Sequence, residues 1–375
     1  MSTSDDVFQT LSEIFSTRNS QVLEIEILSP GFGPLLQDGR SIGITKKALV
    51  QAFAVARSIF FDLIGDSLDT SPHDEKSRSR VDDLLVSSEI LLLFDCEHLT
   101  ACNWRKKRLA ALIQDQDSSN GNSPGYENLI QILESELTLM TTYLCSPLHR
   151  HTKSPTLWQH RSWVLTQTIR AQDRSPMPNS TSQKEEQSIQ GRSPNQELFT
   201  TELTVVLRAG ELHPKNYYAF SYIRQLHRAL SEIGKETGDT FELLAQSAIH
   251  PTVSWCLAHP RDISGWMFVV YLMEAVPDRE IHNDIINKVI RFALDVGWEG
   301  ESLWTFIDLA VKTFGAETAQ EAFRTSTDTI PTTPIQPSEF ETGKAISEKP
   351  WRIWLARARD YWAVNISNNK ENNEI

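Results

Sequence analysis

The sequence has few cysteines and no apolar stretch of membrane-spanning length. Its four cysteines, spread over 375 residues, include no Cys-x-x-Cys pair, which argues against a disulfide framework and the common zinc-binding spacings. No apolar run reaches the ~18 residues that a transmembrane helix needs. The acidic N-terminal stretch lacks the basic and then apolar segments of a signal peptide. These absences predict a reduced, cytoplasmic protein that does not span a membrane.

Positive charge and enzyme motifs are also scarce. The chain has 36 Lys and Arg against 49 Asp and Glu, a net charge of −13, which argues against nucleic acid as a partner. It has no P-loop, no nucleophile elbow, no His-Glu-x-x-His and no aspartate-rich magnesium motif. His149, His151 and His160 have no cysteine or carboxylate at a zinc-ligand spacing, so no metal site is predicted. We expect no complete active site in this chain.

Amphipathic helices are what the sequence does contain. Apolar residues recur at intervals of three and four in segments that predict helices, and the alternating residues 21–28 predict one short strand. These helical segments are residues 44–64, 81–99, 126–144, 197–212 and 283–297. Polar stretches rich in Ser, Pro and Asn separate them and predict loops or disordered insertions.

The polar stretches divide the chain into three parts. Residues 1–80 form an N-terminal extension that is partly helical, and residues 81–315 form a repeat domain with flexible insertions at 114–125 and 171–196. Residues 316–375 are expected to form a linker, a helix around 349–363 and a disordered tail.

A repeat organises the central part. Residues 152–165, 214–226 and 260–272 align on an aromatic anchor, and weaker copies flank them. A helix N-cap stands four residues before each strong anchor, namely Ser154, Asn216 and Asp262, and a helix containing Glu-Leu precedes each copy. The five anchors are Cys102, Trp158, Phe220, Trp266 and Trp304. The pattern predicts an all-α solenoid of helical hairpins, an α–α superhelix, in which the anchor fills the space between paired helices.

The residue before each of the three caps is basic. Lys153, Lys215 and Arg261 therefore stand beside helix N-termini, where a cation does not favour the helix but can help to bind an anion. Equivalent positions of successive repeats line one rim of a solenoid, so a diphosphate or partner carboxylates are candidate ligands. The alternative is that these side chains are ordinary solvated surface residues.

The repeat resembles that of protein prenyltransferase α subunits, and in particular the branch called prenyltransferase α-subunit repeat-containing proteins. The resemblance covers roughly residues 85–315 and depends on a few motifs: "TACNWRKKRL" (100–109), "SPTLWQHRSWVL" (154–165), "HPKNYYAF" (213–220) and "ESLW" (301–304). It implies an α-type subunit of a heterodimeric protein prenyltransferase, adding a geranylgeranyl group to protein cysteine thiols. The β subunit of such an enzyme holds the zinc, the isoprenoid diphosphate and most of the site for a substrate with a C-terminal cysteine.

The resemblance also implies roles for individual residues. Lys153 matches a lysine that contacts the diphosphate, and Lys215 is a second candidate for the same catalytic role. Substrate-binding candidates are Asn216, Tyr217, Tyr218 and Arg261, and we expect one of the two tyrosines to pack inside. Structural candidates are the five anchors with Arg105 and Arg161.

The sequence departs from the family pattern in three respects, one of which is that Cys102 and Phe220 replace two anchor tryptophans. Pro155 stands where the family usually has tyrosine, which removes one substrate contact. The arginine three residues after the anchor is replaced by Ile223, Val269 and Ile307 in three copies, which implies fewer polar links between repeats. The missing arginines favour the alternative function, a non-enzymatic helical-repeat scaffold for protein–protein interaction, while the basic residue that recurs beside each cap in the tandem repeats favours the prenyltransferase subunit.

Overall fold

The computed structural model describes residues 4–18, 20–65, 75–118, 125–174, 193–234 and 240–315. The chain divides into two compact units, residues 1–226 and 227–375. The predicted linker, the helix around 349–363 and the tail lie outside the described residues.

The first unit begins with a small α/β element. Two helices, α1 (Ser4–Thr17) and α2 (Lys46–Gly65), accompany a three-stranded sheet in the order β1-β3-β2. Its strands are β1 (Glu24–Leu28), β2 (Leu35–Asp38) and β3 (Ser41–Thr45), with a 3-10 turn at Pro30–Phe32. β1 runs parallel to β3, and β2 runs antiparallel to it. The sequence predicted one strand here, so the prediction missed β2 and β3.

Short elements and a tight turn explain this difference. Gly39, at φ 57, allows the two-residue connection between β2 and β3, and Ile42 and Ile44 of β3 are fully buried. The outer edge of β1 is covered by the end of helix α5 (Gly125–Leu144): the Thr142 hydroxyl on α5 accepts the Leu23 N–H, and the Ser146 hydroxyl just after the helix accepts the Ile25 N–H. A sheet of such short strands is stabilised by contacts with residues far away in the sequence, and the local pattern of apolar residues does not indicate these contacts.

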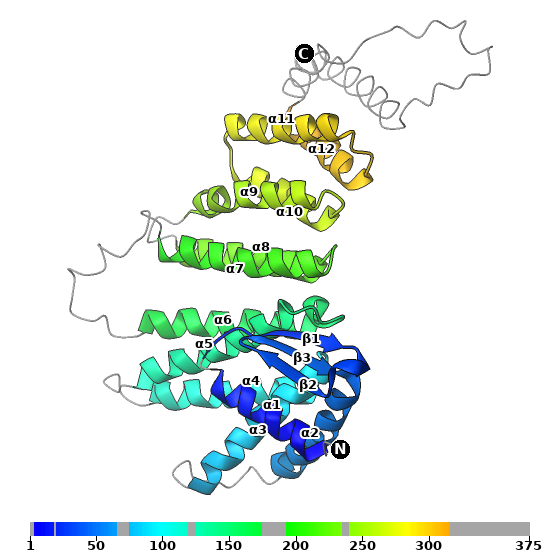
Figure 1. The fold of residues 1–375 in the computed structure, drawn as a ribbon. Coiled ribbons are helices and arrows are strands. Elements are labelled where there is room, and N and C mark those ends of the chain that lie inside the picture. Colours follow the sequence, from blue (N-terminus) through cyan, green and yellow to red (C-terminus); the bar gives the residue numbers. More distant parts are fainter. Residues whose placement is uncertain are drawn as a thin grey trace, which may run out of the picture. The chain divides into compact units, whose positions relative to one another are not determined.

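Helical hairpins form the remaining described residues of both units (Figure 1). The first unit contains α3 (Glu75–Phe94), α4 (Leu99–Ser118), α5, α6 (Pro155–Arg174) and α7 (Pro194–Leu212), with a 3-10 turn η2 (His151–Lys153) before α6. Helix α8 (Tyr217–Ile233) contains the boundary between the units, and the second unit continues with α9 (Phe241–Ala258), α10 (Ile263–Ala275), α11 (Arg279–Val296) and α12 (Glu301–Phe314). The predicted all-α repeat fold is confirmed. Helices α4, α6 and α7 extend into the stretches expected to be insertions.

The predicted caps begin their helices. Ser154 Oγ accepts the Leu157 N–H at 3.1 Å, and Asn216 Oδ1 accepts the Ala219 N–H at 3.2 Å. Asp262 Oδ1 accepts two first-turn N–H groups at 2.9 and 3.2 Å. Each cap therefore satisfies amides that the first turn leaves without an intrahelical partner.

The tryptophan anchors share one further contact that the sequence did not reveal. Trp158, Trp266 and Trp304 each donate their indole N–H to the backbone carbonyl six residues earlier, at 2.9, 3.0 and 2.8 Å. The same bond in three hairpins shows that these positions are structurally equivalent. Phe220 cannot make this bond, and in its hairpin the Asn216 amide instead donates to the Thr152 carbonyl at 2.6 Å.

Buried arginine–glutamate pairs connect successive hairpins of the first unit. Arg105 on α4 donates to both carboxylate oxygens of Glu136 on α5, at 2.8 and 2.6 Å. Arg161 on α6 does the same to Glu202 on α7, at 2.8 and 2.7 Å. Each arginine also donates to a backbone carbonyl of the first helix in its own hairpin. One guanidinium thus ties three helices together, and we call each such set an arginine clamp.

The later copies replace the clamp with apolar packing. Ile223, Val269 and Ile307 occupy the arginine position and are fully buried. Glu242, which aligns with Glu136 and Glu202, is half-buried and accepts a hydrogen bond from Gln246 on its own helix. The arginine link is lost in these repeats, but polar links between hairpins remain: His227 of α8 bonds to the Phe241 carbonyl at 2.8 Å and to the Tyr271 hydroxyl of α10 at 2.9 Å. The predicted loss of polar links therefore applies to the clamp alone.

Glu136 also binds His160, which gives the fold a pH dependence. Their Nε2–Oε1 distance is 2.8 Å, and both side chains are buried. Burial lowers the pKa of His160, but Cys102 and the hydrogen bond and charge of Glu136 outweigh that effect and raise it to about 9. Protonated His160 therefore stabilises the folded state, fully below its ordinary pKa of 6.5 and progressively less as pH rises through 9.

We expect the free energy of unfolding to fall between pH 6.5 and 9, by more than about 1 kcal/mol for this group. Urea unfolding of the full chain across this pH range measures the change. His160→Gln keeps a hydrogen-bonding amide but does not titrate, so the difference between the two proteins isolates His160. A variant with the same pH slope as the original chain would contradict the assignment.

Candidate functional site

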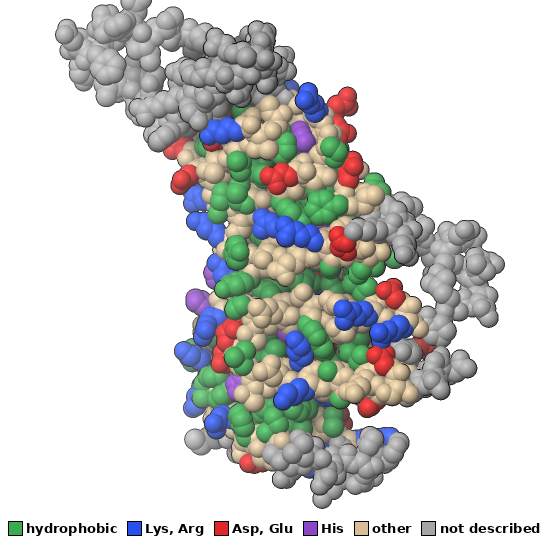
Figure 2. Space-filling view, turned by 180° about the vertical axis from the view of Figure 1, so that it is seen from behind, with side chains coloured by type: hydrophobic (Ala, Val, Ile, Leu, Met, Phe, Trp, Pro, Cys, Tyr) green, Lys and Arg blue, Asp and Glu red, His purple; other side chains and the backbone are tan. Residues whose placement is uncertain are grey.

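Basic and aromatic side chains lie along two connections of the first unit, the one from α5 to α6 and the one from α7 to α8, and His149 and His213 join these connections. We call this the basic face and define it as His149, Lys153, His213, Lys215, Tyr217 and Tyr218. In Figure 2, Lys, Arg and His side chains gather along the left-hand edge of the first unit. The connections between the helices of successive hairpins thus bring together residues that lie more than 60 positions apart.

Two histidines and a lysine of the basic face lie close to one another. The rings of His149 and His213 contact each other, with centroids 6.4 Å apart. Partial burial lowers the pKa of His213, and the positive charge of Lys153 lowers it further. Lys153 therefore lies close enough to His213 for its charge to disfavour protonation of the histidine.

Lys215 adopts a strained backbone conformation. Its φ is 60°, in the left-handed region that costs a non-glycine residue about 1–2 kcal/mol. Its carbonyl accepts the Tyr217 N–H at 3.0 Å, in the tight turn that leads into α8. A lysine at a position that suits glycine or asparagine is a feature that points to a role for its charge.

The two tyrosines are both exposed, which corrects one expectation. The exposed fraction is 67% for Tyr217 and 43% for Tyr218, and their rings meet edge to face at 5.9 Å. Neither packs inside, because Ala219 and Phe220, which follow them on α8, occupy the buried positions. The pair therefore forms an aromatic surface beside Lys215.

Asn216 belongs to the fold and not to the surface. Its side chain is fully buried, its Oδ1 caps α8, and its Nδ2 donates to the Thr152 carbonyl. Both polar atoms of its side chain are therefore engaged within the fold, which leaves it a structural role in this structure. The cap pattern itself carried this information, because a capping amide turned toward the helix cannot also reach a ligand.

Arg261 lies in the second unit, and its surroundings differ from those of the two lysines. Its guanidinium lies over the ring of Trp298, 5.7 Å from the ring centroid, and its carbonyl accepts the Ser302 hydroxyl. Lys153 and Lys215 are both part of the first unit. The rim of three cations stays a prediction, and the basic face is defined within the first unit, where Lys153 and Lys215 are joined by two histidines. His213 was the residue that sequence reasoning missed.

The described residues contain no group of three His, Cys, Asp or Glu side chains that could hold a metal ion. Among the same residues, no helix combines the length and apolarity needed to cross a membrane. The four cysteines are free thiols, as their spacing predicted.

Comparison with known families changes the interpretation of the repeat. Residues 180–313 match the family described as the ECM9 middle domain. The ECM9 match includes Lys215, both tyrosines and Arg261, and ends in α12, while Lys153 lies outside it. No curated protein matches the chain. The resemblance to the prenyltransferase α-subunit family is therefore wrong as an assignment, because the matching family is a different one.

Proposed function

We propose that this chain is a non-enzymatic helical-repeat scaffold that binds an acidic segment of a partner protein at the basic face. The carrying observation is the cluster of Lys153, His149 and His213 in a chain whose net charge is −13. The Lys153 and Lys215 ammonium groups on the basic face of an acidic protein attract an acidic partner there, while the net negative charge of the rest of the chain repels it.

The exposed tyrosines favour a protein as the partner. Tyr217 and Tyr218 offer large aromatic surface with a polar tip, the side-chain type most enriched at the energetic centre of protein interfaces. Their position beside Lys215 lets a partner combine ring contacts with carboxylate contacts. A small inorganic anion would use the cations alone.

Changing both lysines is expected to weaken the binding of an acidic peptide about tenfold, because each exposed charge pair contributes about 0.2–1 kcal/mol. The variant is Lys153→Gln with Lys215→Asn, since asparagine tolerates the backbone conformation at position 215. Fluorescence anisotropy with a labelled glutamate-rich peptide measures the affinity, at two salt concentrations.

Two control variants separate the effect of charge at the basic face on binding from two other effects. These are the change in backbone strain at position 215 and the change in the net charge of the chain. Lys107→Asn removes an exposed cation from α4 outside the basic face and should leave the affinity unchanged. Lys215→Gly relieves the strained backbone and should stabilise the fold while weakening binding. Equal weakening by Lys107→Asn would show that only overall charge matters and would overturn the proposed site.

Prenyl transfer stays a prediction of the sequence. The ECM9 match removes the family resemblance that suggested prenyl transfer. The observation that still favours a phosphate-bearing ligand is that Lys153 lies near His213, whose ring contacts His149. Gel filtration of the chain with a prenyltransferase β subunit tests the partner. Titration with inorganic pyrophosphate tests the ligand, with Lys153→Ala as the variant expected to lose it.

A further inference from the structure

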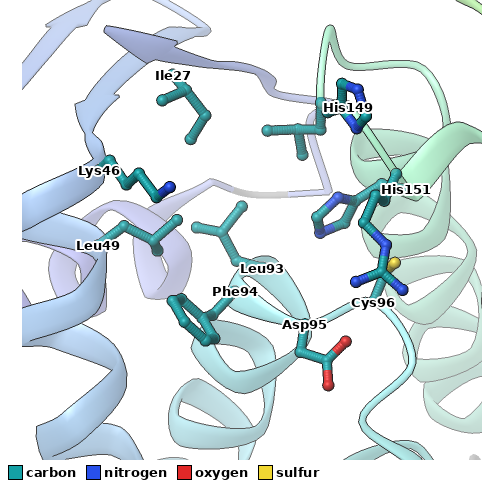
Figure 3. Close-up of a pocket in the computed structure, with 11 residues that line it drawn as sticks. Ile27, Lys46, Leu49, Leu93, Phe94, Asp95, Cys96, His149 and His151 are labelled. Atoms are coloured by element: carbon teal, nitrogen blue, oxygen red, sulfur yellow. The ribbon is translucent and has the colours of Figure 1, made fainter. Parts of the chain in front are cut away.

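An open pocket of about 350 Å³ lies next to the basic face and shares His149 with it (Figure 3). We propose that this pocket receives a bulky apolar side chain of the same acidic partner segment, so that the recognised motif is leucine- or phenylalanine-like and flanked by carboxylates. The inference rests on the proposed function and adds an apolar anchor to it.

The pocket has an apolar floor. Leu49 of α2, Leu93 of α3 and Leu148 of the α5–α6 connection line it and are themselves buried. In Figure 3, Leu49 and Leu93 lie on one side of the cavity and Ile27 lies across from them. Apolar surface of this kind gains about 25 cal/mol per Å² when a partner removes it from water.

Positive charge surrounds that floor. Lys46, at the start of α2, extends toward the middle of the pocket in Figure 3, and His149 lies on the opposite side. Arg150 also lines the pocket. The acidic lining residue is Asp95, whose carboxylate accepts the Glu97 N–H at 3.1 Å and so serves the α3–α4 turn. The balance of charge favours carboxylates on either side of an apolar group.

His151 keeps the inner wall uncharged. Its Nε2 lies 3.0 Å from the Leu92 carbonyl, and burial lowers its pKa, so it is neutral near pH 7. The charges that a ligand meets are therefore those of the rim, and the wall behind them suits an apolar group.

The exposed apolar side chains at the opening of the pocket favour a peptide over a free small molecule as its ligand. Ile27 is 45% exposed and Phe94 is 40% exposed, so the pocket is a bowl with an apolar lip and not an enclosed cavity. Small ligands usually bury 70–90% of their surface in deeper clefts. A peptide can fill the bowl with one side chain, cover the lip with its backbone, and continue through His149 onto the basic face.

The test uses two labelled peptides and the full chain. In one peptide Leu-Phe is flanked by glutamates, and in the other the same glutamates flank Ala-Ala. The Leu-Phe peptide is expected to bind about tenfold more tightly. Ile27→Gln should abolish that preference, and Lys46→Glu should weaken both peptides. Matched controls are Leu36→Gln, with a similarly exposed side chain on β2, and Lys47→Glu, the neighbouring exposed lysine.

The results distinguish failure of the pocket from failure of the basic face. Loss of preference in Ile27→Gln but not in Leu36→Gln supports the anchor pocket. Equal binding of both peptides to the original chain overturns the pocket but keeps the basic face. Failure of both peptides to bind overturns the pocket and the proposed function together. Binding of free decanoate that Ile27→Gln abolishes, without Leu-Phe preference, would identify a small amphiphile as the occupant and overturn the peptide.

Discussion

Replacing Arg161 by methionine is expected to lower the free energy of unfolding of the first unit by about 3–5 kcal/mol. The change leaves Glu202 buried, at 3% exposure, with the hydroxyl of Tyr222 as its remaining donor at 2.6 Å. It also removes the bond from the guanidinium to the Leu137 carbonyl at 3.0 Å. A buried carboxylate without its cation is more costly than the pair was favourable.

A second variant tests that explanation. Arg161→Met with Glu202→Gln removes both charges and keeps an acceptor for the Tyr222 hydroxyl, so it should recover much of the loss. Urea unfolding gives the free energies, and hydrogen exchange across α5, α6 and α7 places the change in the first unit. A double variant as unstable as Arg161→Met alone would show that lost packing, and not the unpaired charge, is responsible.

Both members of the arginine clamp were visible in the sequence, but their pairing was not. The Arg161 position was found from its spacing to the anchor, and Glu202 from the Glu-Leu pair of the preceding helix. They are 41 residues apart, and a polar stretch rich in Ser, Pro and Gln lies between them in the sequence. Sequence periodicity assigns residues to helix faces, while the pairing of faces depends on how hairpins stack.

The basic face was only partly predictable for a related reason. The rule that a basic residue precedes each cap found Lys153 and Lys215, because that rule is local. His149 and His213 meet through two separate connections, and no spacing rule joins them. The exposure of Tyr217 and Tyr218 depends on the helical phase of α8, which Ala219 and Phe220 fix by being buried.

The incorrect family assignment has a physical origin. A cap, an aromatic anchor and an arginine on the second helix are what this hairpin needs in order to begin, to fill its centre and to join its neighbour. Families with the same stacking requirement converge on similar motifs, so such motifs indicate the fold more strongly than the function. Function must be argued from the surface residues, which those requirements do not constrain.

In the second unit, the substitution expected to lower the free energy of unfolding most is at Trp266. We expect Trp266→Ala to destabilise that unit by about 3–5 kcal/mol, because the side chain is fully buried and stacks on Phe306 with ring centroids 4.7 Å apart. The change leaves a cavity and removes the indole bond to the Pro260 carbonyl at 3.0 Å.

Trp266→Phe is the matched control, because phenylalanine is the natural anchor at position 220. It keeps much of the apolar volume and loses the indole bond, so a cost of about 1–2 kcal/mol is expected. Hydrogen exchange should show lost protection in α9 to α12 of the alanine variant, with α3 to α6 unchanged. Equal losses in both groups of helices would mean that the two units unfold as one, and the anchor would then stabilise the whole chain and not its own hairpins.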